Sequence, residues 1–186
     1  MNLQQWCMAL LNQLVKNMKD KKGSAVLIFG LLFLIPLFTF SFWIIESKLL
    51  NTQYNMADDA VVSAGLGALR STNTVDLAYG EYNLDPDTAR ETFYDLLRKN
   101  MKLDYYFRPM PGSIAVGPVF VSEFRVYNPG DYPTECPRGT PINDTSIHVV
   151  VSFKVKRPVL RGLFGQTVDM TIHRDVDNYY SLELED

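Results

Sequence analysis

The sequence contains few of the side chains that build most active sites and disulfide scaffolds. Its 186 residues include only two cysteines and two histidines. Two cysteines exclude a disulfide-rich scaffold, and the sequence has no nucleophile elbow, no phosphate-binding loop and no complete dinucleotide motif. The net charge of −3 gives no basic surface of the kind that nucleic-acid binding requires. We therefore expect a protein that is not an enzyme, needs no cofactor and binds no nucleic acid.

Charge is missing altogether from one long stretch. Residues 23–45 contain no charged side chain, whereas residues 1–22 carry four lysines and one aspartate, and residues 46–186 carry 14 basic and 20 acidic side chains. As a helix the uncharged stretch would be about 34 Å long, close to the thickness of a bilayer core. A buried core helix would rarely be so apolar over this length. A cleaved signal sequence would be shorter and would start earlier.

The flanking charges predict the direction of this helix. Lys16, Lys19, Lys21 and Lys22 precede it, and only Lys48 follows closely. Positively charged flanks stay in the cytoplasm, so the C-terminal part is expected outside the cell membrane. The prediction is a single-pass protein with three parts: a basic cytoplasmic segment (residues 1–22), a transmembrane helix (23–45) and an exported head domain (46–186).

Two features refine the membrane part. Pro36 lies near the middle of the span, where it removes a backbone donor and is expected to kink the helix. Before the span, residues 3–18 carry apolar side chains at helical spacing. This amphipathic segment either lies in the inner headgroup layer or docks on a cytoplasmic partner.

The head is expected to be an α+β domain. Apolar periodicity continues from the span to about Arg70, and a second helix is predicted over residues 85–103, with Asp85 as its cap. Three strands follow, over residues 119–127, 147–156 and 167–177. We predict a pilin-like arrangement in which an antiparallel sheet of three or four strands packs on the two helices. In the first strand, Phe120, Phe124 and Val126 are predicted to share one face.

A ridge of small residues marks the helix after the span. It consists of Ala57, Ala60, Ala64 and Ala68. Small side chains allow close approach of another element. The ridge is therefore a candidate contact for a partner helix, with packing against the protein's own sheet as the alternative.

A second candidate contact is the connection between the last two strands. Unlike most hairpin loops it is apolar, with Leu160, Leu163 and Phe164 close together. Exposed apolar clusters mark interaction surfaces. The loop either touches the membrane or a neighbouring subunit, or it folds back and plugs the end of the core.

The polar residues of the strands offer one weak metal hypothesis. His148 and His173 are both expected on water-facing sides of their strands. His173, Asp175 and Asp177 alternate along one side of the last strand and could bind a divalent cation. A solvated polar face is the simpler interpretation, so we predict no metal. Cys7 and Cys136 fall on opposite sides of the membrane, so Cys136 either pairs with another chain or stays an inert thiol.

Several motifs together resemble the TadE/TadG-like group of the tight-adherence (Flp-type) pilus system. They are Lys21-Lys22-Gly23-Ser24, the apolar run around Pro36, Ala57-Asp58-Asp59-Ala60, and more loosely Leu163-Phe164-Gly165 with the strand after it. The resemblance implies a minor pilin or pilus-assembly component with a membrane helix and an exported head. Its partners would be the lipid bilayer and other pilin-like subunits, including copies of itself.

The same resemblance marks Gly23 and Ser24 as a possible processing site. Relatives of this kind carry Glu at the fifth position after the cleavage point, and here that position is Ile28. We therefore do not expect cleavage. The competing hypothesis for the whole chain is an exported binding or sensor module that recognises a ligand through the polar face of its sheet.

Overall fold

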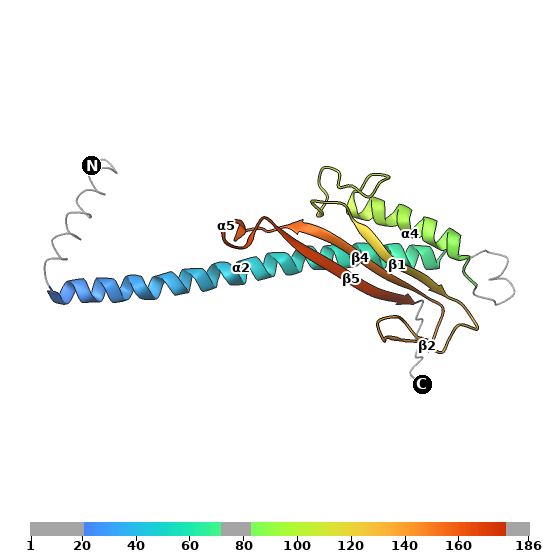
Figure 1. Cartoon of the computed structure of the whole chain (residues 1–186), viewed down its shortest axis with the longest axis horizontal. Coiled ribbons are helices and arrows are strands. Elements are labelled where there is room, and N and C mark those ends of the chain that lie inside the picture. Colours follow the sequence, from blue (N-terminus) through green and yellow to red (C-terminus); the bar gives the residue numbers. More distant parts are fainter. Residues whose placement is uncertain (1–20, 72–82, 178–186) are drawn as a thin grey trace, which may run out of the picture. The chain divides into compact units, whose positions relative to one another are not determined.

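The computed structural model describes residues 21–71 and 83–177. The predicted amphipathic segment before residue 21, and Cys7 within it, lie outside the described residues. The described chain contains three helices and five strands (Figure 1), which are α2 (Lys21–Leu69), α4 (Pro86–Met101), β1 (Phe120–Tyr127), β2 (Thr134–Glu135), β3 (Pro141–Ile142), β4 (Ser146–Lys156), α5 (Arg161–Phe164) and β5 (Thr167–Asp177). The chain divides into two compact units, with the boundary between Ser47 and Lys48.

The described part of the first unit is the apolar half of α2. The side chains of residues 26 and 28–45 are all exposed, although nearly all are apolar. Among the described residues, α2 is the one helix long and apolar enough to cross a membrane by length and composition, so it is a candidate membrane anchor. The helix continues unbroken through Pro36, and Gly23 and Ser24 lie within its first turn. The predicted kink and the absence of processing stay predictions.

The second unit is an α+β domain, as predicted. Its main sheet is antiparallel with the order β1–β4–β5, and β2 and β3 form a separate two-stranded sheet. Side chains from α2, α4 and one face of the main sheet form a single apolar core. The prediction of an α+β domain with an antiparallel sheet of three or four strands packed on two helices is confirmed, and the main sheet has three strands.

Helix α4 begins and ends as its sequence predicts. The Asp85 carboxylate accepts a hydrogen bond from the backbone N–H of Thr88 at 2.9 Å, and Pro86 occupies the first turn. Hydrogen bonds from the Thr88 hydroxyl and N–H lower the pKa of Asp85. Lys102 adopts a left-handed conformation (φ 55°), and its N–H closes the last turn of the helix.

The ridge of small residues on α2 is buried inside this unit. Ala57, Ala60, Ala64 and Ala68 all belong to the core. The approach of β5 is so close that a Cβ atom added at Gly65 would lie 2.8 Å from Cγ2 of Val176. The ridge is therefore buried in the protein's own core, which it shares with α4 and the sheet, and this face of α2 is not available to a partner helix while the head is folded.

An ion pair holds the edge of the same contact. The Arg174 guanidinium on β5 donates to the Asp58 carboxylate on α2, with Nε 2.6 Å from Oδ1. This hydrogen bond, with the neighbouring negative charge, raises the pKa of Arg174. The pair is half-exposed, so it sets the register of strand against helix more than it stabilises the fold.

The prediction for the face of β1 was wrong at one residue. Phe120 does not share the core face with Phe124 and Val126, and 62% of it is exposed. The register against β4 shifts between Val121 and Glu123, so Ser122 forms a β-bulge. A bulge inserts one residue and reverses the alternation. Val121 therefore joins the core face, whereas Phe120 and Glu123 both turn to the outer face of the sheet.

Because Ala64 is fully buried, Ala64→Leu should destabilise the head by about 1–3 kcal/mol through overpacking. Thermal unfolding of the full chain in detergent, followed by circular dichroism, measures this. Ser63→Leu introduces the same side chain at the adjacent exposed position and should change stability by no more than about 0.5 kcal/mol. If the two variants had the same melting temperature, the burial of the ridge in the core of the head would be contradicted.

Candidate functional site

The outer face of the main sheet carries a cluster of polar side chains from three strands. In the sheet register, Arg125 on β1 and Asp175 on β5 flank His148 on β4, and Glu123 and His173 flank Val150. Side chains two residues apart on a strand, or opposite each other on neighbouring strands, share one face. The register therefore brings Glu123, His148, His173 and Asp175 together.

His148 is the centre of this cluster and is fully buried. Its Nδ1 lies 2.7 Å from Oδ1 of Asp175, and its Nε2 lies 3.2 Å from Oε2 of Glu123. The hydrogen bond from His148, with a second from Arg138, lowers the pKa of Glu123. Both ring nitrogens of His148 are therefore held by carboxylates.

The prediction that His148 faces water was wrong. The segment between β1 and β4, which carries β2 and β3, lies against this part of the sheet. Arg138 from this segment pairs with Glu123 at 3.2 Å, and Cys136 contacts His173. As a result the N-terminal half of β4 is buried on both faces, and only its C-terminal half alternates between buried and exposed side chains.

Cys136 completes the cluster from the turn between β2 and β3. Its Sγ lies 3.8 Å from Nε2 of His173, and the thiol is buried. The backbone N–H groups of Arg138 and Thr140 both point at this sulfur from 3.4 Å. The tight turn that aims them depends on Gly139, whose φ is +82°.

These side chains present three kinds of donor atom to one point. One sulfur, nitrogen or oxygen atom from each of Cys136, His148, His173 and Asp175 lies within 4.8 Å of the others. The predicted set of His173, Asp175 and Asp177 is thus brought together only in part, because Asp177 is not a member. The sequence analysis missed Cys136, His148 and Glu123, since none of them is near His173 in the chain.

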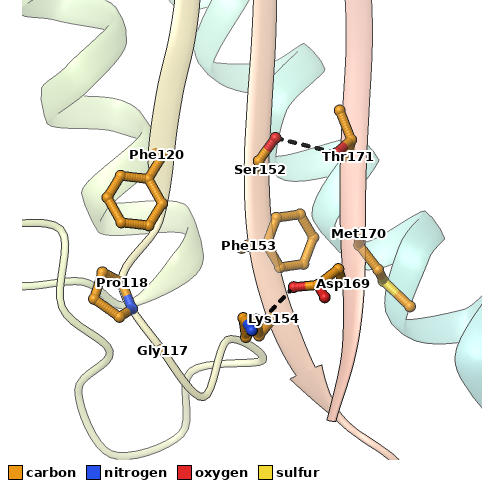
Figure 2. A pocket seen from close by; sticks show the side chains of 9 residues that line it. All are labelled: Gly117, Pro118, Phe120, Ser152, Phe153, Lys154, Asp169, Met170 and Thr171. Carbon is orange, nitrogen blue, oxygen red and sulfur yellow. Dashed lines mark hydrogen bonds and ion pairs between the residues drawn. The ribbon is translucent and has the colours of Figure 1, made fainter.

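A shallow open pocket lies on the outer face at the other end of the sheet (Figure 2). The exposed ring of Phe120 forms one wall, and β4 and β5 form the other. Two polar pairs cross the strands there: Ser152 with Thr171 at 3.1 Å, and Lys154 with Asp169 at 3.4 Å. The pocket offers an apolar contact with a polar rim and no cluster of catalytic groups.

The apolar connection between β4 and β5 projects from the head. It contains the short helix α5, on which 74% of Leu163 and 63% of Phe164 is exposed, whereas Leu160 is half-buried. The Arg157 guanidinium lies over the Phe164 ring, 5.7 Å from its centre. Leu163 and Phe164 therefore do not plug the core, and they form an exposed surface in which apolar and basic groups adjoin.

A second exposed aromatic surface follows α4. Tyr105 and Tyr106 are among the most exposed large side chains of the head, and their rings pack edge to face. The guanidinium of Arg98 lies 5.2 Å from the Tyr105 ring centre, and that of Arg108 lies 5.6 Å from the Tyr106 ring centre. Tyrosine and arginine are the residue types that dominate binding energy at protein interfaces.

Comparison with family models, with curated proteins and with solved structures finds no significant match to this chain.

The double variant Leu163→Asp with Phe164→Asp should leave the melting temperature of the full chain nearly unchanged, because both side chains already face outwards. Differential scanning calorimetry in detergent tests this. A control, Ile172→Asp, places the same charge in the core and should abolish cooperative unfolding. If the double variant also melts early, the connection is part of the core after all.

Proposed function

We propose that this protein is a membrane-anchored, pilin-like subunit of the cell envelope that acts by associating with other subunits. In this proposal it is a TadE/TadG-like minor pilin or pilus-assembly component. One observation carries the proposal: a single helix, α2, has an apolar half whose side chains are all exposed and a second half that is the core of the head.

The exposed half of α2 requires a nonaqueous environment. Isolated apolar side chains on a surface are ordinary, but a helix that is apolar all round over 20 residues is not stable in water. Its few hydroxyls are already paired inside the helix: Thr39 donates to the carbonyl of Ile35 and Ser41 to that of Leu37, each at 2.9 Å. These two hydroxyl groups therefore need no hydrogen-bond partner from the surrounding bilayer.

The flanking charges orient the anchor in the proposal. The lysines before the span place the N-terminus in the cytoplasm and the head outside. The acidic head then stands away from the negative inner surface of the membrane.

Association would use surfaces other than the alanine ridge. That ridge is buried in the core of the head, so the remaining candidates on the head are the two exposed clusters already described. Leu163 and Phe164 adjoin Arg157, and Tyr105 and Tyr106 stack with arginines. A subunit of this kind would pack against the bilayer, against other pilin-like subunits and against copies of itself.

The alternative is an exported binding or sensor module that recognises a ligand on its outer sheet face. The pocket beside Phe120 favours it, because it is open and mostly apolar. A single mutation can distinguish the two proposed functions. Phe120→Ser should impair a binding module and leave subunit association intact.

A cysteine-labelling experiment tests the predicted topology. Cys136 is unsuitable because it is buried, so an exposed position on α4 is used instead: Glu91→Cys in a Cys7→Ser background. A membrane-impermeant maleimide should label this variant in intact cells. The native Cys7 should react only after lysis. Labelling of Cys7 from outside would reverse the orientation and exclude an exported head.

A cross-linking experiment in native membranes tests association itself. The unmodified protein should form cross-linked species with copies of itself or with other envelope subunits. Tyr105→Ala with Tyr106→Ala, or Leu163→Asp with Phe164→Asp, should reduce their yield severalfold, and the exposed control Glu91→Ala should not. A protein that stays monomeric at native abundance would contradict the proposal.

A further inference from the structure

We propose that Cys136, His148, His173 and Asp175 bind one Zn²⁺ ion, and that this ion fixes the segment carrying β2 and β3 to the outer face of the sheet. The inference is independent of the proposed pilus function, because it concerns a site on the head that neither the anchor nor the association surfaces use.

The donor set selects the metal. A thiol sulfur, two imidazole nitrogens and a carboxylate oxygen are the ligands of zinc sites, and four such ligands satisfy its tetrahedral preference. Calcium and magnesium require mainly oxygen ligands, which this cluster does not supply. Mixed sulfur and nitrogen ligation also suits other late transition ions such as Co²⁺, which can serve as a spectroscopic probe.

The spacing of the donors is close to that of a bound ion. Zinc–ligand bonds of about 2.0–2.3 Å in a tetrahedron separate neighbouring ligand atoms by about 3.3–3.6 Å. Here the separations are 3.8 Å from Cys136 Sγ to His173 Nε2, 3.1 Å from His173 Nε2 to Asp175 Oδ2, and 2.7 Å from His148 Nδ1 to Asp175 Oδ1. The remaining pairs of donor atoms lie within 4.8 Å of one another, so the side chains would have to close around the ion by about 1 Å.

The ligands also have the supporting contacts that metal ligands need. A metal-bound histidine usually donates its other ring N–H to a carboxylate, which fixes the ring. If His148 binds through Nδ1, its Nε2–H points at Glu123 from 3.2 Å. Glu123 is in turn paired with Arg138. At the sulfur, the N–H groups of Arg138 and Thr140 supply the donors that stabilise a thiolate.

Burial and position indicate a structural role for the ion. His148 and Cys136 are buried, 10% of the Asp175 side chain is exposed, and His173 is the most open ligand at 27%. The ion could therefore enter beside His173 and would then be enclosed. Three ligands come from β4 and β5, and the fourth comes from the turn after β2. Zinc would thus connect the segment that carries β2 and β3 to the main sheet, next to the ion pair of Arg138 with Glu123.

The test uses the full chain in detergent with Cys7→Ser, so that Cys136 is the only thiol. Isothermal titration should show one Zn²⁺ per chain, and Co²⁺ should give the thiolate-to-metal charge-transfer absorption and the intense visible bands of a tetrahedral site. Zn²⁺ should also raise the melting temperature of the protein, whereas Mg²⁺ and Ca²⁺ should not.

Single substitutions then assign the ligands. Cys136→Ser should abolish the cobalt charge-transfer band, and His173→Gln should weaken Zn²⁺ binding at least 100-fold. Glu123→Gln removes only a supporting contact and should weaken binding by about 10–100-fold. Asp177→Asn changes a carboxylate on the same strand that is outside the cluster and should have no effect.

The site is a hydrogen-bonded polar cluster and not a metal site if the Cys7→Ser protein shows neither a cobalt charge-transfer band nor a rise in melting temperature with Zn²⁺. The same conclusion follows if Cys136→Ser binds Zn²⁺ as tightly as its parent. Both measurements on the Cys7→Ser protein are independent of the ligand variants. The proposal can therefore be rejected even if a ligand variant fails to fold.

Discussion

The head depends on the close approach of β5 to α2. A Cβ atom added at Gly65 would lie 2.8 Å from Val176 on β5, and Ala57, Ala60, Ala64 and Ala68 on α2 are buried in the same core. Larger side chains would separate strand and helix, and interiors tolerate such changes poorly because they are packed to crystal-like density. The second half of α2 is therefore as much a core element of the head as any strand, although its residues follow directly from an apolar span.

This packing leaves the sheet with two different faces. The inner face is apolar and lies on α2 and α4. On the outer face, the bulge at Ser122 turns both Phe120 and Glu123 outwards. Phe120 then borders the shallow pocket, whereas Glu123 reaches His148. A single inserted residue in β1 thus supplies one wall of the pocket and one supporting side chain of the proposed zinc site.

The proposed functions use separate parts of the molecule. The apolar half of α2 is the candidate membrane anchor, and the clusters around Phe164 and Tyr106 are exposed on the head. The proposed zinc site lies on neither. It would stabilise the segment between β1 and β4, whose two short strands make only a two-residue pairing. Anchoring, association and metal binding can therefore be tested independently by mutation.

Local patterns in the sequence were sufficient for the anchor and for most elements of the head. The apolar span, the cap at Asp85 and the alternation in β5 each depend on residues close together in the chain, and the structure has α2, α4 and the three long strands where these patterns place them. Which element covers a given face of a helix or sheet does not depend on nearby residues in the chain. The alanine ridge fits a partner helix or the protein's own sheet equally well, and only the folded head shows that the ridge is buried in the protein's own core.

The cluster of polar side chains on the outer face of the main sheet illustrates the same limit more clearly. His148 alternates with apolar residues and has the pattern of a water-facing side chain, yet it is buried beside Asp175 and Glu123, where the segment between β1 and β4 lies against the sheet. Cys136 has no metal-binding neighbour in the sequence, and its contact with His173 spans 37 residues. The sequence by itself determined which segments form helices and strands, because hydrophobic periodicity and capping act within a few residues. Only the tertiary structure decided which side chains meet, because strand register, a bulge and a covering loop are properties of the whole domain.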